Sequence, residues 1–502
     1  MKFIICVILC CLISFMANAA VHLGPGQNFS NIEAAVRASA IHPGDTVYLH
    51  AGSYSGWQGI DTLKGNANAW ITILPYQNDL IDISGCWQFM GCEYIKLLKL
   101  RFIANSKYPG RLLNVDNRGS CATQSRNITI DSCYFTGVTD ANAITALKFG
   151  GVDFFLVTNN IFNNIMACDA MDYNVCRHGI ISGNIIQNCL TGGHIKGGAW
   201  DITMERNLFI NGSAATWVAF EFGGDTGQQF YCPGDTFEVK DLRFYSNLII
   251  GGYRGLALSS AVSCKVVNNT FYNCGQATLR FLTTSQLYPK LKGNIVENNI
   301  FAFGQSAYIN GSSQTADAAS LSNNIYYSIA NPNFTGPYWD LPELKDIKEN
   351  NPMIFNSNTV IFKDGANNDL SLVKGSPAIG NGKPQSEPDS DFYGNKYSAK
   401  RCIGAVEFLE PADVILMDNS NELFLFPNPA INKLNLKLNS PLNESFSLII
   451  YDISGNEILK ENIINKTGKI EFDIIHLQTG YYSLCIFQMG KSAIRKNFII
   501  TN

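Results

Sequence analysis

A short motif with alternating polar and apolar positions recurs through the middle of the chain. In each copy an asparagine stands directly before two apolar residues, as in "VTNNIF", "ISGNII" and "VENNIF". This two-residue period is typical of half-buried β-strands and not of helices. The asparagines that align in these copies are Asn160, Asn184, Asn207, Asn247, Asn269, Asn299 and Asn324.

The spacing of these asparagines predicts how the strands are arranged. Most of the intervals between neighbouring copies fall between 22 and 25 residues. A strand that returns at this spacing, with asparagine at one fixed place, predicts the coils of a parallel β-helix. Stacked asparagines can then form a ladder of hydrogen bonds. The interval of 40 residues between Asn207 and Asn247 predicts one coil with an insertion.

Before the repeats, residues 30–54 predict a short helix followed by a strand. Ser30 can cap the helix, and Glu33 follows three residues later, which is the spacing of a capping box. The stretch "PGDTVYLHAG" then predicts a turn and an alternating strand. We expect the helix to cover the open end of the coil, where unpaired strand edges would otherwise be exposed.

These features resemble the secreted pectate-lyase-like superfamily, whose first coil typically carries a PGDTV-like stretch. The segment "LSLVKGSPAIGNGKP" with "DFYGNKYSAKRCIGAVEF" is similar to the closing segment of many bacterial β-helix proteins. The resemblance implies an all-β fold, a right-handed single-stranded parallel β-helix with an N-terminal capping helix, over residues 21–409.

The two ends of the chain predict export. Residues 1–20 combine Lys2, an apolar run and the small-residue site Ala17-Asn18-Ala19, which is the pattern of a secretory signal peptide. No later segment approaches twenty apolar residues, so no transmembrane segment is expected.

At the other end, residues 423–502 alternate like the strands of a small β-sandwich and follow a polar linker at 410–422. The stretches "FPNP", "YDISGNEI" and "LQTGYYSL" and the basic-then-apolar ending resemble the C-terminal sorting domain of the type IX secretion system of Bacteroidetes. This resemblance implies that the secretion machinery is a partner, and that the protein is released or anchored on the outer-membrane surface.

The composition of the chain limits which kinds of binding partner are expected. The chain has 502 residues, of which 16% are charged, and a net charge of -4, so we expect no nucleic-acid partner and a monomer. Export permits disulfides, and the cysteines closest in sequence are the candidate pairs Cys86/Cys92 and Cys168/Cys176, with buried free thiols as the alternative.

Counting back from the ladder asparagines places ionisable residues in one column. Lys148 and Asp172 each lie 12 residues before an aligned asparagine, whereas Lys196 lies 11 and His194 lies 13 residues before the next one. Successive coils are about 4.8 Å apart, so these side chains are expected to form one mixed-charge patch. In "GGHIKGGAWD" the glycines beside His194 are expected to leave room for a sugar ring.

The next coils add further candidates. The glycine-rich segment "FEFGGDTG" carries Glu221 and Asp225, and Asp235 follows in the insertion, so these carboxylates are the expected ligands of a Ca²⁺ ion. In "TLRFL", Arg280 stands alone between apolar residues, where a guanidinium could clamp a substrate carboxylate. The expected substrate-binding residues are Lys148, Asp172, Trp217, Glu221 and Arg254.

These residue types favour a polysaccharide lyase that cleaves a uronate-containing chain by β-elimination. Lys196 is the expected base, His194 the base or its acid partner, and Arg280 the carboxylate clamp that stabilises developing charge. The pattern departs from alginate-lyase and chondroitin-lyase β-helices, whose catalytic Lys and Arg lie about one coil apart.

Two alternatives stay open. A glycoside hydrolase would need two carboxylates, for which Asp169, Asp172 and Asp201 are available, although the motifs of β-helix polygalacturonases are absent from the sequence. A non-catalytic surface glycan-binding protein or adhesin would use the same glycines and aromatic residues for the fold alone.

Overall fold

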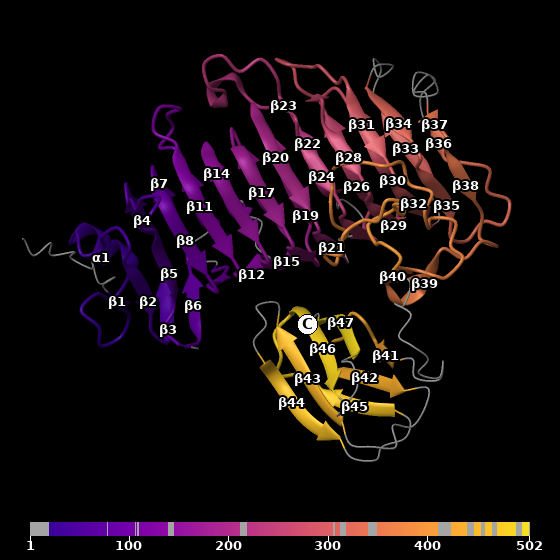
Figure 1. Ribbon diagram of the computed structural model, residues 1–502. Helices are drawn as coiled ribbons and strands as arrows, with labels where there is room; N and C mark the ends of the chain where they lie inside the picture. The colour runs from indigo at the N-terminus through magenta and orange to yellow at the C-terminus, as the bar shows by residue number, and fades with distance from the viewer. Residues whose placement is uncertain are drawn as a thin grey trace, which may run out of the picture.

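The repeats form a parallel β-helix whose coils stack in a row (Figure 1). The computed structural model describes residues 20–500 apart from 78, 106, 108–109, 139–144, 211–217, 305–306, 312–317, 340–348, 410–422, 439–445, 453–456, 464–468 and 488–493. The expected signal peptide, except for Ala20, and the expected linker lie outside these residues. Each coil passes through three sheets, which we call A, B and C.

Sheet A contains 15 strands, and the strands of its main path pair in parallel. They are β1 (Ala20–Leu23), β2 (Thr46–Leu49), β5 (Ile71–Pro75), β8 (Glu93–Leu98), β11 (Ser125–Asp131), β14 (Val152–Thr158), β17 (Arg177–Ser182), β20 (Ala199–Glu205), β23 (Val239–Lys240), β24 (Arg243–Tyr245), β27 (Ala261–Val262), β28 (Lys265–Val267), β31 (Asn294–Glu297), β34 (Ala319–Ser322) and β37 (Glu349–Asn350).

Sheet B contains 12 strands and follows sheet A along each coil. They are β3 (Gly52–Ser55), β6 (Ile81–Ser84), β9 (Arg101–Ile103), β12 (Tyr134–Val138), β15 (Ile161–Ile165), β18 (Ile185–Gln187), β21 (Leu208–Ile210), β25 (Leu248–Ile250), β29 (Thr270–Cys274), β32 (Ile300–Phe303), β35 (Ile325–Ser328) and β38 (Met353–Phe355).

Sheet C contains 11 strands and carries the predicted mixed-charge patch. They are β4 (Gln58–Asp61), β7 (Trp87–Met90), β10 (Arg111–Asp116), β13 (Thr145–Gly150), β16 (Asp169–Asn174), β19 (Thr191–Lys196), β22 (Val218–Gly223), β26 (Arg254–Ser259), β30 (Ala277–Leu282), β33 (Tyr308–Gly311) and β36 (Tyr338–Trp339).

The predicted asparagine ladder is confirmed at the turn between sheets A and B. All seven aligned asparagines are fully buried. From Asn184 to Asn324, each Oδ1 accepts hydrogen bonds from the asparagine of the preceding coil: the backbone N–H of Asn207 donates to Asn247 at 2.9 Å, and its side-chain amide donates to the same oxygen at 3.0 Å. The amide of Asn207 also donates to the carbonyl of Ile181. The ladder therefore locks each turn to the coil on either side.

The interior is filled by rings that repeat once per coil. In sheet B, Phe102, Phe135 and Phe162 stack with ring centroids 5.0 and 4.7 Å apart. All three side chains are fully buried. Parallel offset rings at this spacing stabilise beyond the apolar area that they bury. The core is thus continuous along the coil axis.

The predicted capping helix is present, but its N-cap was predicted wrongly. Helix α1 (Ile32–Arg37) is capped by Asn31, whose side chain accepts a hydrogen bond from the N–H of Ala34, and not by Ser30. Glu33 does not close a capping box. Its carboxylate pairs with Arg37 and accepts a hydrogen bond from the N–H of Gly59.

The C-terminal domain consists of two antiparallel sheets, as the alternating pattern predicts. One contains β41 (Leu423–Phe426), β42 (Lys433–Leu438) and β45 (Lys469–Asp473); the other contains β43 (Phe446–Asp452), β44 (Glu457–Ile463), β46 (Gly480–Phe487) and β47 (Ile494–Ile500). The closing segment of the β-helix before this domain contains an antiparallel hairpin of β39 (Phe362–Asp364) and β40 (Asp369–Leu372).

The predicted disulfide pairs were wrong. Cys121 and Cys232 form the disulfide, whereas Cys86, Cys92, Cys168 and Cys176 are free. Cys92 and Cys176 are buried in the coil, and burial raises the pKa of both thiols to about 12. Proximity in sequence does not bring cysteines together here because each coil separates sequence neighbours while stacking residues from different turns.

Loss of one ladder side chain should destabilise the whole coil. We expect Asn247→Ala to lower the free energy of unfolding by about 3 kcal/mol, because it leaves buried donors of the neighbouring coil unsatisfied. Urea unfolding followed by circular dichroism measures this change. The exposed Asn68 offers a matched control, and Asn68→Ala should leave the midpoint unchanged.

The disulfide should be visible by peptide mapping. A non-reducing digest of the secreted protein is expected to contain one cross-linked peptide pair joining Cys121 to Cys232. Alkylation before reduction should label Cys86 and the other free thiols after unfolding. A cross-link between Cys168 and Cys176 would contradict the structure.

Candidate active site

The predicted mixed-charge residues occupy one register position on successive strands of sheet C. We call this set the sheet C column. Its members, in strand order, are Asn114, Lys148, Asp172, His194, Glu221, Ala257, Arg280 and Asn310. The sequence therefore correctly predicted that Lys148 and Asp172 lie side by side on neighbouring strands. His194, and not Lys196, follows Asp172 in the sheet C column.

Lys148, Asp172 and His194 form a connected cluster. The Lys148 ammonium pairs with Oδ2 of Asp172, and Nε2 of His194 lies 2.8 Å from Oδ1 of the same carboxylate. The amide of Asn174, on the same strand, also donates to Asp172 at 2.7 Å. Asp172 is buried, so these partners hold a carboxylate that would otherwise be costly to bury.

Two carboxylates beside His194 titrate in opposite directions. Burial would raise the pKa of Asp172, but His194 and Lys148 outweigh it and hold this pKa well below its usual range. Asp169 lies three residues earlier, with Oδ2 3.5 Å from Nδ1 of His194. Burial raises the pKa of Asp169 against the opposing charge of His194. When the surroundings of two carboxyl groups shift their pKa values in opposite directions, one group can act as an acid and the other as a base.

Lys196 lies two residues beyond His194 on β19, level with Asn174. Among the residues that the structure describes, its ammonium has no carboxylate within 4.0 Å. The insertion between β22 and β23 runs beside it. A Cβ added at Gly224 would lie 3.4 Å from Cδ of Lys196, and buried Glu238 of the insertion accepts a hydrogen bond from the N–H of Gly197.

The disulfide ties this insertion to an earlier coil. Cys232 belongs to the insertion, and Cys121 lies in the turn between β10 and β11. Asp235 of the insertion pairs with Arg177 at 3.1 Å on an intervening coil. The predicted insertion therefore folds back along the turns between sheets C and A, on the side where Lys196 stands.

The glycines around His194 and Lys196 do not leave room for a sugar. A Cβ at Gly193 would lie 1.8 Å from the carbonyl oxygen of Met171, and one at Gly192 would lie 1.9 Å from that of Ala219. Gly198 has a φ of 81° and a Cβ there would lie 2.5 Å from a carboxylate oxygen of Asp235. These positions need glycine because backbone and insertion occupy the space.

The other half of the column is less connected. Glu221 accepts a hydrogen bond from Ser259, and Ala257 separates it from Arg280. Arg280 donates to Asn310 at 3.0 Å. It lies three strands from His194, which is about 14 Å at the usual strand spacing. The structure thus separates Arg280, the expected carboxylate clamp, from β19, which carries the expected base Lys196. The spacing in the sequence had indicated this separation.

Two further substrate-binding candidates lie elsewhere. Arg254 begins β26, donates to Gln276 at 2.7 Å and lies over the ring of Tyr253. Its register partner on the next strand is Ala277, so it belongs to the edge of sheet C and not to the column. Trp217 lies outside the described residues.

The three expected Ca²⁺ ligands have different partners. Glu221 bonds Ser259, the side chain of Asp225 accepts from the N–H of Gln286 at 3.0 Å, and Asp235 pairs with Arg177. Within the described residues no group of three or more acidic, His or Cys side chains could hold a metal ion. We therefore derive no step through a cation, and the Ca²⁺ site stays a prediction.

The carboxylates named for a hydrolase are only partly brought together. Asp169 and Asp172 both face His194 on sheet C. Asp201 lies on sheet A, where it pairs with Arg243 at 2.7 Å. Of the residues that sequence reasoning missed, Asn174 could have been found, because it lies 22 residues before Lys196.

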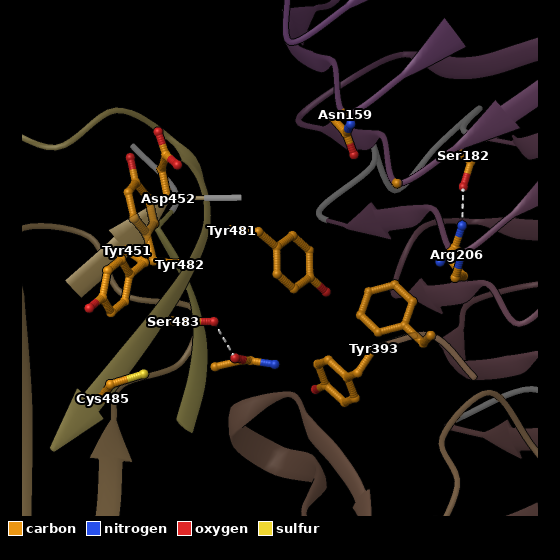
Figure 2. A pocket seen from close by; sticks show the side chains of 13 residues that line it. Asn159, Ser182, Arg206, Tyr393, Tyr451, Asp452, Tyr481, Tyr482, Ser483 and Cys485 are labelled. Carbon is orange, nitrogen blue, oxygen red and sulfur yellow. Dashed lines mark hydrogen bonds between the residues drawn. The ribbon is translucent and has the colours of Figure 1, made fainter. Parts of the chain in front are cut away.

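A cavity of about 610 Å³ lies away from the column, between the β-helix and the C-terminal domain (Figure 2). Its walls include Ser182 at the end of β17, Arg206 directly after β20, and Tyr393, Tyr481 and Asp452 from later segments. None of the predicted catalytic residues lines it. Five of the thirteen residues that line the cavity are aromatic, and the connected cluster of Lys148, Asp172 and His194 lies elsewhere, so we place the candidate active site on sheet C.

Comparison with known families identifies the end of the chain. Residues 424–501 match the family model described as the secretion system C-terminal sorting domain. The C-terminal domain is a type IX secretion sorting domain. A protein carrying this sorting domain is secreted or displayed at the cell surface, as the sequence indicated. Within the described residues, no helix combines the length and apolar character needed to cross a membrane.

The β-helix is similar to solved polysaccharide lyases. Pectate lyase Pel9A is 14% identical over 78% of this chain and 98% of that chain, with a TM-score of 0.46. The PL6 family alginate lyase AlyGC is 14% identical over 78% of this chain and 60% of that chain, with a TM-score of 0.43. A comparison with curated protein sequences gave no match. The likeness concerns the fold.

Matched substitutions at the two carboxylates should have opposite effects on stability. At neutral pH, Asp172→Asn is expected to lower the free energy of unfolding by about 3 kcal/mol, since it leaves Lys148 and His194 without their shared partner. Asp169→Asn should raise it, because ionising Asp169 in the folded state is unfavourable.

The pH dependence separates these effects. The contribution of Asp172 is present above the unfolded carboxyl pKa of about 3.9 and is lost as pH falls through its lowered pKa. The gain from Asp169→Asn should vanish below that unfolded pKa, where both states bind the proton. Urea unfolding at several pH values measures both, and a shift of the same sign for the two variants would contradict the assignment.

Proposed function

We propose that the protein is a secreted polysaccharide lyase that cleaves a uronate-containing glycan by β-elimination on the outer face of sheet C. The observation that carries the proposal is the sheet C column, which aligns Lys148, Asp172, His194, Glu221 and Arg280 on neighbouring coils. Cationic and imidazole side chains in line along the coil axis suit an extended acidic polymer. The sorting domain supplies the route to such extracellular substrates.

Lys196 is the proposed base. Lys148 already neutralises Asp172, whereas the ammonium of Lys196 has no carboxylate within 4.0 Å among the described residues. Its neutral amine takes the proton from the carbon next to the uronate carboxylate. The electron pair of the broken carbon–hydrogen bond forms a carbon–carbon double bond as the neighbouring bond from carbon to the glycosidic oxygen breaks.

His194 is the proposed acid partner. Its imidazole, held with Nε2 2.8 Å from the carboxylate of Asp172, delivers a proton to the leaving oxygen. Arg280 is too far along the column to serve the same sugar as His194, so it binds the carboxylate of another sugar in the chain. Lys196 and His194 thus act on the reacting sugar, and Arg280 positions the chain by binding another sugar.

A hydrolase is the second candidate because of one observation, the pair Asp169 and Asp172. Both carboxylates contact His194, and their pKa values are shifted in opposite directions. An acid and a base of this kind could hydrolyse a glycosidic bond. The two reactions leave different products, since only elimination creates a carbon–carbon double bond.

Replacing the base should abolish elimination without affecting folding. We expect Lys196→Ala to lower kcat by about a thousandfold on a cleaved uronate polymer, because general base catalysis typically contributes this much. The measurement is the rise in ultraviolet absorbance of the unsaturated product. Lys265→Ala on sheet A is the matched control and should keep full activity.

The outcomes of this assay are distinct. Full activity in Lys196→Ala would refute the proposed base. New reducing ends without the absorbance would favour the hydrolase, and retention on the polymer without cleavage would favour a binding protein. Repeating the assay with a chelator, then with added Ca²⁺, tests the predicted cation.

A further inference from the structure

A row of three aromatic rings stands on sheet A, next to the sheet that carries the column. Phe154, His178 and Trp200 come from β14, β17 and β20. The rings of Phe154 and His178 stack with centroids 4.6 Å apart and planes 13° apart, and the Trp200 ring meets His178 edge-on at 4.6 Å. The row therefore runs along the coil axis, across the same coils as β13, β16 and β19.

Phe154 is exposed, whereas the rings of His178 and Trp200 are partly buried. Phe154 is 51% exposed, and Leu156 and Ile180, on the same sheet, are 40% and 42% exposed. Phe154 and His178 have φ values of 55° and 51°. The same left-handed conformation recurs at the matching position of neighbouring strands, at Tyr94, Asn127 and Asp201, so it is a regular feature of this coil. The fold thus keeps a large ring in solvent at a position that asparagine would suit better.

Charged groups lie between the rings but are paired with one another. Asp153 lies 2.6 Å from Nδ1 of His178, and Asp201 pairs with Arg243 at 2.7 Å. Arg177, the register partner of Trp200, pairs with Asp235. The row therefore offers no strong net charge to a ligand, in contrast to the face that carries Lys196 and Arg280.

We propose that Phe154, His178 and Trp200 form a binding site for an uncharged polysaccharide, separate from the sheet C column. Sugar C–H groups would pack against the parts of these rings that remain open to solvent, chiefly Phe154, and the carboxylates of Asp153 and Asp201 would accept hydrogen bonds from sugar hydroxyls. A second copy of the chain suits this surface less well, because the core of a protein interface is depleted of charged residues.

The site holds the secreted protein on a neutral glycan matrix, while the column acts on an acidic chain. A position outside the reaction centre allows both ligands to bind at once, because the two surfaces lie on different sheets. The proposal does not depend on the reaction assigned to sheet C.

Affinity gel electrophoresis tests the proposal with a soluble galactomannan in the gel, alongside sedimentation with insoluble cellulose. At least one of these neutral polysaccharides is expected to retain the full-length protein. Phe154→Ala/Trp200→Ala should weaken retention by about tenfold or more, since each lost ring contact contributes up to about tenfold. Trp57→Ala removes another ring, 52% exposed, and should bind like the wild type.

Circular dichroism and activity on a soluble uronate polymer should be unchanged in the double variant, which separates loss of binding from loss of folding. Lys196→Ala should keep full binding to the neutral polysaccharide, so failure of the lyase assignment leaves this result intact. Retention of neither neutral polysaccharide, equal retention of the double variant, or a dimer in gel filtration that the double variant abolishes would each overturn the proposal.

Discussion

The buried asparagine ladder is the constraint on which the rest of the structure depends. From Asn184 onward, each Oδ1 accepts from two donors of the preceding coil, so a turn cannot slip by one residue without leaving buried polar groups unsatisfied. At one end the ladder passes to Glu349, whose carboxylate accepts from the amide of Asn324 at 2.9 Å. Burial raises the pKa of Glu349, and these hydrogen bonds oppose that shift.

A fixed register at one corner sets the register of all three sheets. Because the strands of sheet C inherit this register, side chains that are 22 to 36 residues apart in sequence align on one line. Repetition alone does not decide what those side chains are. The coils that hold Lys148, Asp172 and His194 carry charge where the ends of the same column carry Asn114 and Asn310.

The regular part of this architecture could be predicted from the sequence. The ladder asparagines, the capping helix, the insertion and the sorting domain follow from local patterns with a known period or spacing. The alignment of Lys148 with Asp172 on neighbouring strands followed from counting back from the ladder asparagines. The count was off by one residue at His194, which lies 13 and not 12 residues before its asparagine, because the turn between sheets C and A is one residue longer on that coil.

Other features depend on contacts that no local pattern records. The disulfide joins Cys121 to Cys232, 111 residues apart, because the insertion folds back over several coils. The glycines near His194 are needed for the backbone of adjacent strands and for Asp235 of that insertion. Asp201 lies on sheet A and not in the sheet C column, because it follows the turn at Gly197 and Gly198.

Surface chemistry differs between neighbouring sheets of the same coils. Sheet C presents an imidazole and cations beside two carboxylates of opposite pKa shift, whereas sheet A presents stacked rings among paired charges. Both surfaces are positioned by the same coil register, and the insertion lies along the turns between them. The proposed reaction and the proposed attachment thus lie on different faces of one scaffold.

The central claim is that sheet C cleaves a uronate chain by elimination. Mass spectrometry of the products formed in water enriched in heavy oxygen tests it most directly. Elimination takes no oxygen from water, so the account predicts an unlabelled, unsaturated end on one product and no heavy oxygen on the other. Incorporation of heavy oxygen at the new reducing end would show hydrolysis and would contradict the account.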